Sequence, residues 1–328
     1  MKECLRVKSS VRKYWPEYKW PNISAMLNNM KRPPLTNSEL FRNKLVVITG
    51  ATSGIGYRTA RKYASMGAQI IMVNRNPDKS EVVRREIASE FGTPIDYVIA
   101  DLSLLADVQR AGQHLLSLDR PIDVLIHNAG VHLESRQETV EGLEVNFAVH
   151  YLCPLLMTKM LVPKYQRDMN GRVIFVSSEA YRFAAWGLDL DDLQWLKRRY
   201  TGLAAYGAGK LAAILSMHIL ARELAPLNVT LNAMHPGMVR TESGKSNGRI
   251  YQWYKRNILD KYSGSAESSA EALYYLGTSP EVDNVSDVFF HMTTPEELAP
   301  PAQDIQAAQD IWSATWDMLR NRGIVLHD

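Results

Sequence analysis

The chain has 328 residues, of which 46% are hydrophobic and 22% are charged, and its formal net charge is +3. These values are typical of a soluble globular protein. The sequence contains no zinc-finger or RNP pattern and no long basic stripe, which argues against nucleic-acid binding. It has two cysteines, no secretory h-region and no run of about 18 apolar residues. We therefore expect a cytoplasmic protein without a disulfide framework.

The charge is unevenly distributed. Residues 1–43 contain nine Lys or Arg residues against three Glu residues, whereas residues 44–328 carry a net charge of −3. We treat 1–43 as a basic N-terminal arm. A narrow apolar face in residues 1–20 favours packing on the protein body or on a partner subunit. Contact with an anionic membrane surface, which would make the protein peripheral to a membrane, is the less favoured alternative.

The stretch from Lys44 to Arg75 has the pattern strand, glycine turn, helix, strand. Residues 45–49 and 68–73 are short apolar runs typical of buried parallel strands, and residues 57–66 have helical periodicity. The turn between them contains Gly50, Gly54 and Gly56. Such a turn lets backbone N–H groups approach a pyrophosphate at a helix N-terminus, so it predicts dinucleotide binding.

Strands and helices continue to alternate after this unit. The predicted strands are 96–100, 123–127, 172–177 and 229–234, and the predicted helices are 76–91, 103–118, 141–165 and 206–224. We expect Ser103 to cap its helix, and Pro154 and Pro163 to interrupt theirs. The alternation predicts an α/β fold, a Rossmann-type doubly wound parallel β-sheet with helices on both faces in three α/β/α layers. It places one catalytic domain in residues 44–328.

A tyrosine and a lysine lie four residues apart in the predicted helix 206–224. Tyr206 and Lys210 would share one helix face. A nearby ammonium favours the phenolate and would lower the pKa of the tyrosine from its usual value of about 10. Ser178 ends the strand before this helix, where its hydroxyl could hold a substrate oxygen while Tyr206 exchanges a proton.

Together with other motifs along the chain, these residues resemble those of the short-chain dehydrogenase/reductase family. The motifs that carry the resemblance, in order, are Thr49-Gly50-xxx-Gly54-x-Gly56, Asp101-Leu102, Asn128-Ala129-Gly130, Asn146, Ser178, Tyr206-xxx-Lys210 and Pro236-Gly237-x-Val239-x-Thr241. The match spans residues 43–325. Within the family, the chain is similar to the retinol dehydrogenase and WW-domain oxidoreductase branch, as indicated by Arg75-Asn76, the long Ser178–Tyr206 spacing and the tail from Tyr275 to Trp312. It contains no WW module in residues 1–43.

The resemblance implies a role for each motif. Tyr206 would be the general acid or base, Lys210 would lower its pKa and bind the nicotinamide ribose, and Ser178 would polarise the carbonyl. Asn146 would hold a water that connects Lys210 to solvent. The implied cofactor contacts are Gly50, Ser53, Gly54, Ile55, Gly56, Arg75, Asp101, Leu102, Asn128, Ala129, Gly130, Tyr206, Lys210, Pro236, Gly237, Val239 and Thr241.

The residues at the end of the second predicted strand indicate which dinucleotide cofactor is preferred. NAD-preferring members place a carboxylate there, but this sequence has the neutral Asn74 followed by Arg75. A guanidinium can pair with a 2′-phosphate, so we expect NADP(H) to be preferred, with NAD(H) as the alternative.

The histidines show no zinc spacing, and we expect no metal site. His127 stands where the family usually has Asn, and we interpret it as structural. The others are interpreted as core or surface residues: His114, His132, His150, His218, His235, His291 and His327. Gly207 and Gly209 lie within the predicted catalytic helix, for which we consider close approach to the cofactor or helix packing as reasons.

Two segments, 179–205 and 242–264, are expected to be loops over the substrate. The aromatic and apolar residues that we expect to line the site are Tyr181, Phe183, Trp186, Leu188, Trp195, Tyr251, Trp253 and Tyr254. Such a lining suits a bulky hydrophobic small-molecule substrate, and we expect a retinoid, a steroid, a long aldehyde or an aromatic ketone.

The sequence thus indicates an NADP(H)-dependent carbonyl reductase or alcohol dehydrogenase. Two alternatives remain, a non-catalytic cofactor-binding scaffold or regulatory protein, and a C=C or imine reductase of the same fold. The family resemblance also implies pairing of long helices in a homodimer.

Overall fold

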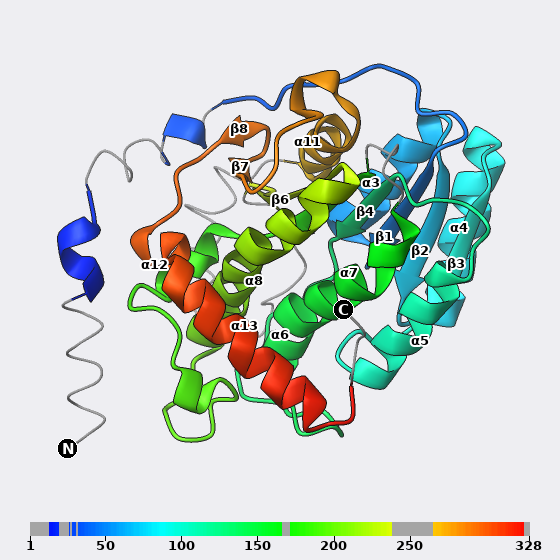
Figure 1. The fold of residues 1–328 in the computed structure, drawn as a ribbon. Helices are drawn as coiled ribbons and strands as arrows, with labels where there is room; N and C mark the ends of the chain where they lie inside the picture. The colour runs from blue at the N-terminus through cyan, green and yellow to red at the C-terminus, as the bar shows by residue number, and fades with distance from the viewer. Residues whose placement is uncertain are drawn as a thin grey trace, which may run out of the picture.

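An eight-stranded sheet forms the centre of the computed structural model, which describes residues 13–19, 26, 28–30, 32–165, 171–237 and 265–324 (Figure 1). Its order is β3-β2-β1-β4-β5-β6-β7-β8, and every pairing is parallel except β7 with β8. The strands are β1 Leu45–Thr49, β2 Gln69–Asn74, β3 Ile95–Ile99, β4 Val124–His127, β5 Gly171–Val176, β6 Val229–His235, β7 Phe289–His291 and β8 Thr294–Pro295. The first six match the predicted strands, whereas the short β7 and β8 were not predicted.

Both faces of the sheet are covered by helices (Figure 1). Alternate residues of β1 belong to different cores, because successive side chains of a strand point to opposite faces: Leu45 and Val47 pack on one side, Val46 and Ile48 on the other. The second core contains α3 Gly54–Ser65, α4 Pro77–Phe91 and α11 Ala266–Thr278. The first contains α5 Leu105–Leu116, α7 Cys153–Leu161, α8 Gly202–Leu224, α12 Pro300–Gln303 and α13 Ile305–Arg320. The doubly wound three-layer fold is therefore confirmed.

The N-terminus of α5 differs from the prediction. Ser103 does not cap this helix, because its hydroxyl donates to the Asp101 carboxylate at 2.7 Å and the helix begins two residues later. The Glu141 carboxylate instead accepts from the backbone N–H groups of Leu105 (2.7 Å) and Ala106 (3.0 Å). A side chain 36 residues away in sequence thus satisfies the first turn, which local pattern cannot reveal.

The helix predicted over 141–165 is divided into segments. Glu144 caps α6 Val145–Phe147, and the chain continues through a π-helical segment, η2 Ala148–Leu152, into α7 and the 3-10 turn η3 Val162–Lys164. Pro154 and Pro163 mark the beginnings of the last two segments. Proline has no N–H to donate, which explains why the regular hydrogen-bond ladder changes there.

Two stretches of the described residues, Val145–Lys164 and Gly202–Leu227, are long and apolar enough to cross a membrane. In the fold, 78% and 72% of their most apolar windows are buried. Core helices satisfy the same criterion, so the finding is weak evidence for a membrane span.

One short part of the arm, around Trp15 and Tyr18, lies against the predicted substrate loop. The rings of Trp15 and Tyr18 lie 6.2 and 6.4 Å from that of Trp186, and the Tyr14 hydroxyl donates to Asp304 at 2.7 Å. The loop itself contains two 3-10 turns, η4 Glu179–Phe183 and η5 Leu190–Asp192, before α8 begins at Gly202. The second predicted loop, 242–264, lies outside the described residues.

We predict that Gly277→Ala will lower the free energy of unfolding by about 1–3 kcal/mol, measured by urea denaturation. Gly277 of α11 faces Tyr63 of α3, and an added Cβ would lie 1.9 Å from the Tyr63 hydroxyl oxygen. That hydroxyl donates to the Leu273 carbonyl at 3.1 Å. In Tyr63→Phe/Gly277→Ala the steric conflict is relieved, so the double variant should lose less than the sum of the single variants. Additive losses would contradict the packing argument.

Candidate active site

Of the predicted cofactor residues, Gly50, Asn128 and Ala129 meet where β1 and β4 lie side by side. The chain leaves these neighbouring strands in opposite directions, and such a switch point opens a crevice at their carboxyl ends. The Asn128 side chain closes the contact by donating to the carbonyls of Thr49 (3.0 Å) and Gly50 (2.9 Å). The backbone N–H groups of Asn128 and Ala129 both donate to the Thr49 hydroxyl at 3.0 Å.

The glycine turn has the geometry that a pyrophosphate requires. Gly50 and Gly54 have φ values of +69° and +57°, which favour glycine. A Cβ on Gly56 would lie 2.2 Å from the Gly50 carbonyl oxygen and 2.4 Å from Asn128 Nδ2, whereas a Cβ on Gly54 would meet open space. Ser53 precedes α3 and its side chain makes no capping bond. The first N–H groups of α3, including that of Ile55, are thus available to an anion, and the site fits a dinucleotide.

The end of β2 presents one cation and one neutral side chain. Asn74 is buried, and its side chain accepts from Ala51 N–H at 2.7 Å and donates to Ser80 at 3.2 Å. The next side chain, Arg75, is 75% exposed and lies 3.8 Å from the Asp101 carboxylate. Asn74 therefore supports the glycine turn, while the Arg75 guanidinium is accessible to a ligand beside Asp101 and the buried Leu102.

Three of the four predicted catalytic residues come together at the ends of β5 and α8. Ser178 follows β5, and its side chain interacts with the Tyr206 phenol. One helical turn further along α8, Lys210 Nζ donates to the Val176 carbonyl at 2.6 Å and lies 5.8 Å from the centre of the Tyr206 ring. A hydroxyl, a phenol and an ammonium thus face one side of the crevice.

The electrostatics differ from the expectation for the Tyr–Lys pair. Burial raises the pKa of Tyr206, and the interaction with Ser178 opposes that shift only partly. Burial also lowers the pKa of Lys210 to about 7. Because the lysine is itself desolvated and directed at a carbonyl, it does not produce a net lowering of the Tyr206 pKa. The phenol carries its proton at neutral pH and can act as a proton donor.

Asn146 is fully buried on α6. Its Nδ2 donates to the Glu144 carboxylate (3.0 Å) and to the Tyr200 hydroxyl (2.8 Å), which itself donates to Glu144 at 3.0 Å. A water held by Asn146 for Lys210 stays a prediction. A Cβ on Gly209 would lie 3.3 Å from the Asn146 carbonyl oxygen, and one on Gly207 would lie 2.5 Å from that of Ala180. Close packing of α8 therefore explains both glycines.

Two histidines near Tyr206 were not identified as site residues from the sequence. The rings of His150 and His132 lie edge-on to the phenol, with centres 4.8 and 5.6 Å away. His150 is buried, its Nε2 contacts the backbone of Val131, and burial lowers its pKa well below the usual value. A Cβ on Gly130 would lie 2.9 Å from this ring. The sequence signal that could have identified His150 was its position four residues after Asn146, on the same helix face.

Two further predicted cofactor residues, Pro236 and Gly237, lie at the end of β6. Pro236 follows the strand, and its carbonyl accepts from the Ser269 hydroxyl at 2.7 Å. Gly237 has a φ of +74°. Val239 and Thr241 lie outside the described residues.

We predict that His127→Asn will reduce the loss of stability on acidification. His127 is buried with Nε2 3.0 Å from the Thr158 hydroxyl, and burial lowers its pKa to about 3. The unfolded chain therefore gains a proton below about pH 6.5 that the folded chain does not. The free energy of unfolding consequently decreases as the pH is lowered. Between about pH 7 and 5 the variant should lose about 2 kcal/mol less than the wild type in urea titrations. The exposed His114→Asn is the control, and an unchanged pH slope in His127→Asn would refute the interpretation.

Two protein-family models match this chain. Residues 44–187 match the family model described as short chain dehydrogenase, and residues 194–285 match the model described as Enoyl-(Acyl carrier protein) reductase. The chain is 33% identical to human retinol dehydrogenase 13 over 275 residues, covering 82% of each chain. It is 30% identical to the human WW domain-containing oxidoreductase over 288 residues, covering 86% of this chain and 69% of that protein.

Among solved structures, L-sorbose reductase from Gluconobacter frateurii, complexed with NADPH and L-sorbose, has a TM-score of 0.60 with this chain. It is 22% identical, and the match covers 77% of this chain and 95% of that one, so the likeness concerns the fold. The sequence matches also confirm the similarity to the retinol dehydrogenase and WW-domain oxidoreductase branch. The chain belongs to the short-chain dehydrogenase/reductase family, whose members are NAD(P)-dependent oxidoreductases acting on CH–OH and C=O groups.

Proposed function

We propose that the protein is an NADP(H)-dependent carbonyl reductase or alcohol dehydrogenase for a bulky apolar substrate. The observation that carries this proposal is the convergence of Ser178, Tyr206 and Lys210 at the edge of the sheet that holds the glycine turn. A proton donor and an oxygen-binding hydroxyl on the dinucleotide side of the sheet are what carbonyl reduction requires.

The chain's own residues account for the proton in this reaction. NADP(H), when bound, supplies or accepts the hydride. In reduction, the Ser178 hydroxyl holds the carbonyl oxygen beside the Tyr206 phenol, and the phenolic proton passes to that oxygen as the carbon becomes an alcohol carbon. Oxidation reverses the proton transfer, with Tyr206 as the base. Lys210 supplies a positive charge near the phenolate that forms, and its ammonium is oriented by the Val176 carbonyl.

The preference for NADP(H) rests on Arg75. Its guanidinium is exposed at the end of β2, and no carboxylate occupies the Asn74 position to bind a ribose 2′-hydroxyl. A relative in fold, L-sorbose reductase, is complexed with NADPH. These observations favour a 2′-phosphate contact at Arg75.

The substrate class rests on the loop after Ser178. Phe183 is 61% exposed and Trp186 is 38% exposed. Tyr181 and Trp195, by contrast, are buried in packing contacts, with Tyr181 against Phe289 and Trp195 against Tyr200. The apolar surface offered to a substrate is thus smaller than the sequence predicted, but it stays aromatic. A retinoid, a steroid, a long aldehyde or an aromatic ketone suits it, and a similar protein is named a retinol dehydrogenase.

We predict that Tyr206→Phe will lower kcat for carbonyl reduction by about 10²–10⁴-fold, because it removes the proton donor. NADPH binding, followed by cofactor fluorescence, should change little. Tyr97→Phe on β3, away from the reacting groups, is the matched control and should keep its activity. Undiminished reduction of a panel of apolar aldehydes and ketones by Tyr206→Phe would disprove the mechanism.

Arg75→Ala should lower the ratio of kcat/KM for NADPH to that for NADH by about 10–100-fold, since one charge-assisted contact to phosphate is lost. Steady-state kinetics with each cofactor measure this ratio. Arg85→Ala removes an exposed cation from α4 and serves as the control. A ratio that stays the same in Arg75→Ala would rule out the 2′-phosphate contact.

A further inference from the structure

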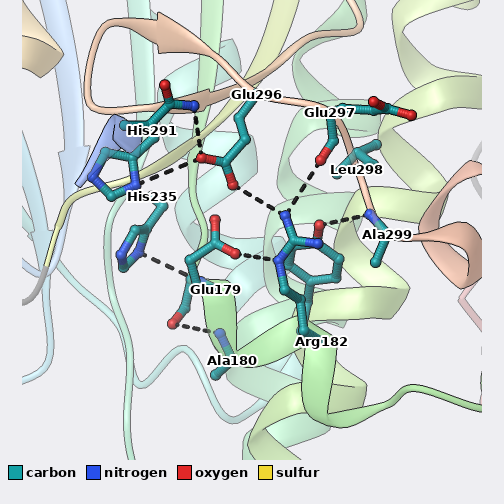
Figure 2. A network of polar contacts seen from close by, with 12 residues as sticks. Glu179, Ala180, Arg182, His235, His291, Glu296, Glu297, Leu298 and Ala299 are labelled. Carbon is teal, nitrogen blue, oxygen red and sulfur yellow. Dashed lines mark hydrogen bonds and ion pairs between the residues drawn. The ribbon is translucent and has the colours of Figure 1, made fainter. Parts of the chain in front are cut away.

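A buried charged network begins at Glu179, the residue that follows Ser178 in the chain (Figure 2). Two of its residues belong to η4: Glu179 and Arg182. The Arg182 guanidinium binds the Glu179 carboxylate through Nε and the Glu296 carboxylate through Nη2, the latter at 3.0 Å. The Glu296 side chain is 2% exposed and that of Glu179 is 18% exposed. One cation thus holds two carboxylates that come from distant parts of the chain.

The charges of this network do not balance if both carboxyl groups are ionised. The other titratable groups around it are Tyr181 on η4, His235 on β6 and His291 on β7, with Tyr18 of the arm near Arg182 and Lys210 of α8 near His235. Burial lowers the pKa of both histidines, so at neutral pH they contribute no positive charge. Asn29 donates a neutral hydrogen bond to Glu296 at 3.0 Å. One negative charge therefore remains in excess in a buried space, which is unfavourable.

The orientation of the two carboxyl groups indicates how the excess is removed. Glu179 Oε2 is bound by Arg182, whereas Oε1 is buried and has no donor among the described residues. Figure 2 shows this second oxygen directed toward Glu296, and the carboxylate oxygens that the two side chains offer lie within 4.8 Å of each other. Two carboxylate oxygens cannot bond unless one carries a proton. A single shared proton would satisfy Oε1 and neutralise the network.

We propose that Glu179 and Glu296 share one proton in a pair held by Arg182, and that this pair positions Ser178 for the reaction. The inference rests on the proposed function only in its second part, because the shared proton can be detected without turnover.

The connection to Ser178 runs through the η4 turn. Ser178 is the N-cap of η4, and its Oγ accepts from Ala180 N–H at 3.2 Å. Glu179 N–H lies 3.4 Å from His235 Nδ1, which ties the turn to the end of β6 just before Pro236. Bonds from Glu179 and Arg182 to Glu296 therefore fix the orientation of the turn that Ser178 caps. Ionisation of both carboxyl groups would weaken those bonds, so the Ser178 hydroxyl would be held less firmly in position.

The pair should titrate near neutral pH. Burial raises the pKa of Glu179 to about 7, with Arg182 opposing this shift and Glu296 adding to it. The shared proton is present at lower pH and is lost as the pH rises through about 7, so the positioning of Ser178 weakens on the alkaline side.

Infrared spectroscopy of the pH titration tests the proton itself. The wild type should show a protonated-carboxyl band at about pH 6 that disappears by about pH 8.5. Glu179→Gln and Glu296→Gln should both lack this change, because an amide supplies the hydrogen-bond donor permanently. Glu297→Gln, an exposed neighbour outside the pair, should titrate like the wild type. Persistence of the band change in both pair variants would overturn the proposal.

A pH profile of carbonyl reduction tests the positioning role. In the wild type, kcat should fall about tenfold on the alkaline side of an inflection near pH 7, with the KM for NADPH unchanged. Because the pKa of Lys210 is also about 7, the readout is the difference between variants. Glu179→Gln and Glu296→Gln should keep the activity of the acidic limb and show a smaller alkaline fall than the wild type, while Glu297→Gln falls like the wild type. An alkaline fall of equal size in the wild type and in both pair variants would refute positioning by the pair. Absence of any turnover in the wild type would instead refute the proposed function, and the infrared result would stand.

A bound cation is the competing way to remove the excess charge. Glu179, His291 and Glu296 each offer a ligand atom, all within 4.8 Å of one another. A stoichiometric divalent metal in the purified protein, with no protonated-carboxyl band and a pH profile that changes on chelation, would overturn the shared proton.

Discussion

The close approach of β1 and β4 at the switch point is the constraint on which the rest of the site depends. Asn128 and Thr49 join the two strand ends through four hydrogen bonds, and Gly56 has no room for a side chain between them. This contact fixes the glycine turn, the start of α3 and the beginning of the segment that leads to His132. Because the parallel strands end at one edge of the sheet, Ser178 and Pro236 from β5 and β6 open onto the same crevice.

Burial controls the chemistry of the groups around this crevice. It keeps the proton on Tyr206, lowers the pKa of Lys210 to about 7 and keeps the neighbouring histidines neutral. A neutral phenol beside a serine hydroxyl suits reduction, where a proton must be given to the substrate oxygen. The low dielectric of the same region explains why Glu179 and Glu296 are not stable as two separate charges beside one guanidinium.

Packing also explains departures from the family pattern. Gly207 and Gly209 bring α8 against the backbones at Ala180 and Asn146, so they serve the approach of helix to site rather than a direct cofactor contact. His127 is held by Thr158 inside the sheet layer, as expected of a structural residue. In the arm, Trp15 and Tyr18 lie against Trp186, so a segment remote in sequence borders the loop that we assign to the substrate.

The sequence by itself determined the parallel sheet and its first six strands, and it predicted motif residues at the carboxyl ends of those strands, because alternating apolar periodicity and glycine spacing are local signals. Only the tertiary structure decided which charges face one another. Glu141 caps α5, Tyr181 and Trp195 turn into packing contacts, His150 lies against Tyr206, and Glu179 meets Glu296 across 117 residues of chain. The physical reason is that pKa values and contacts of buried polar groups depend on neighbours brought together by folding, which local pattern does not encode.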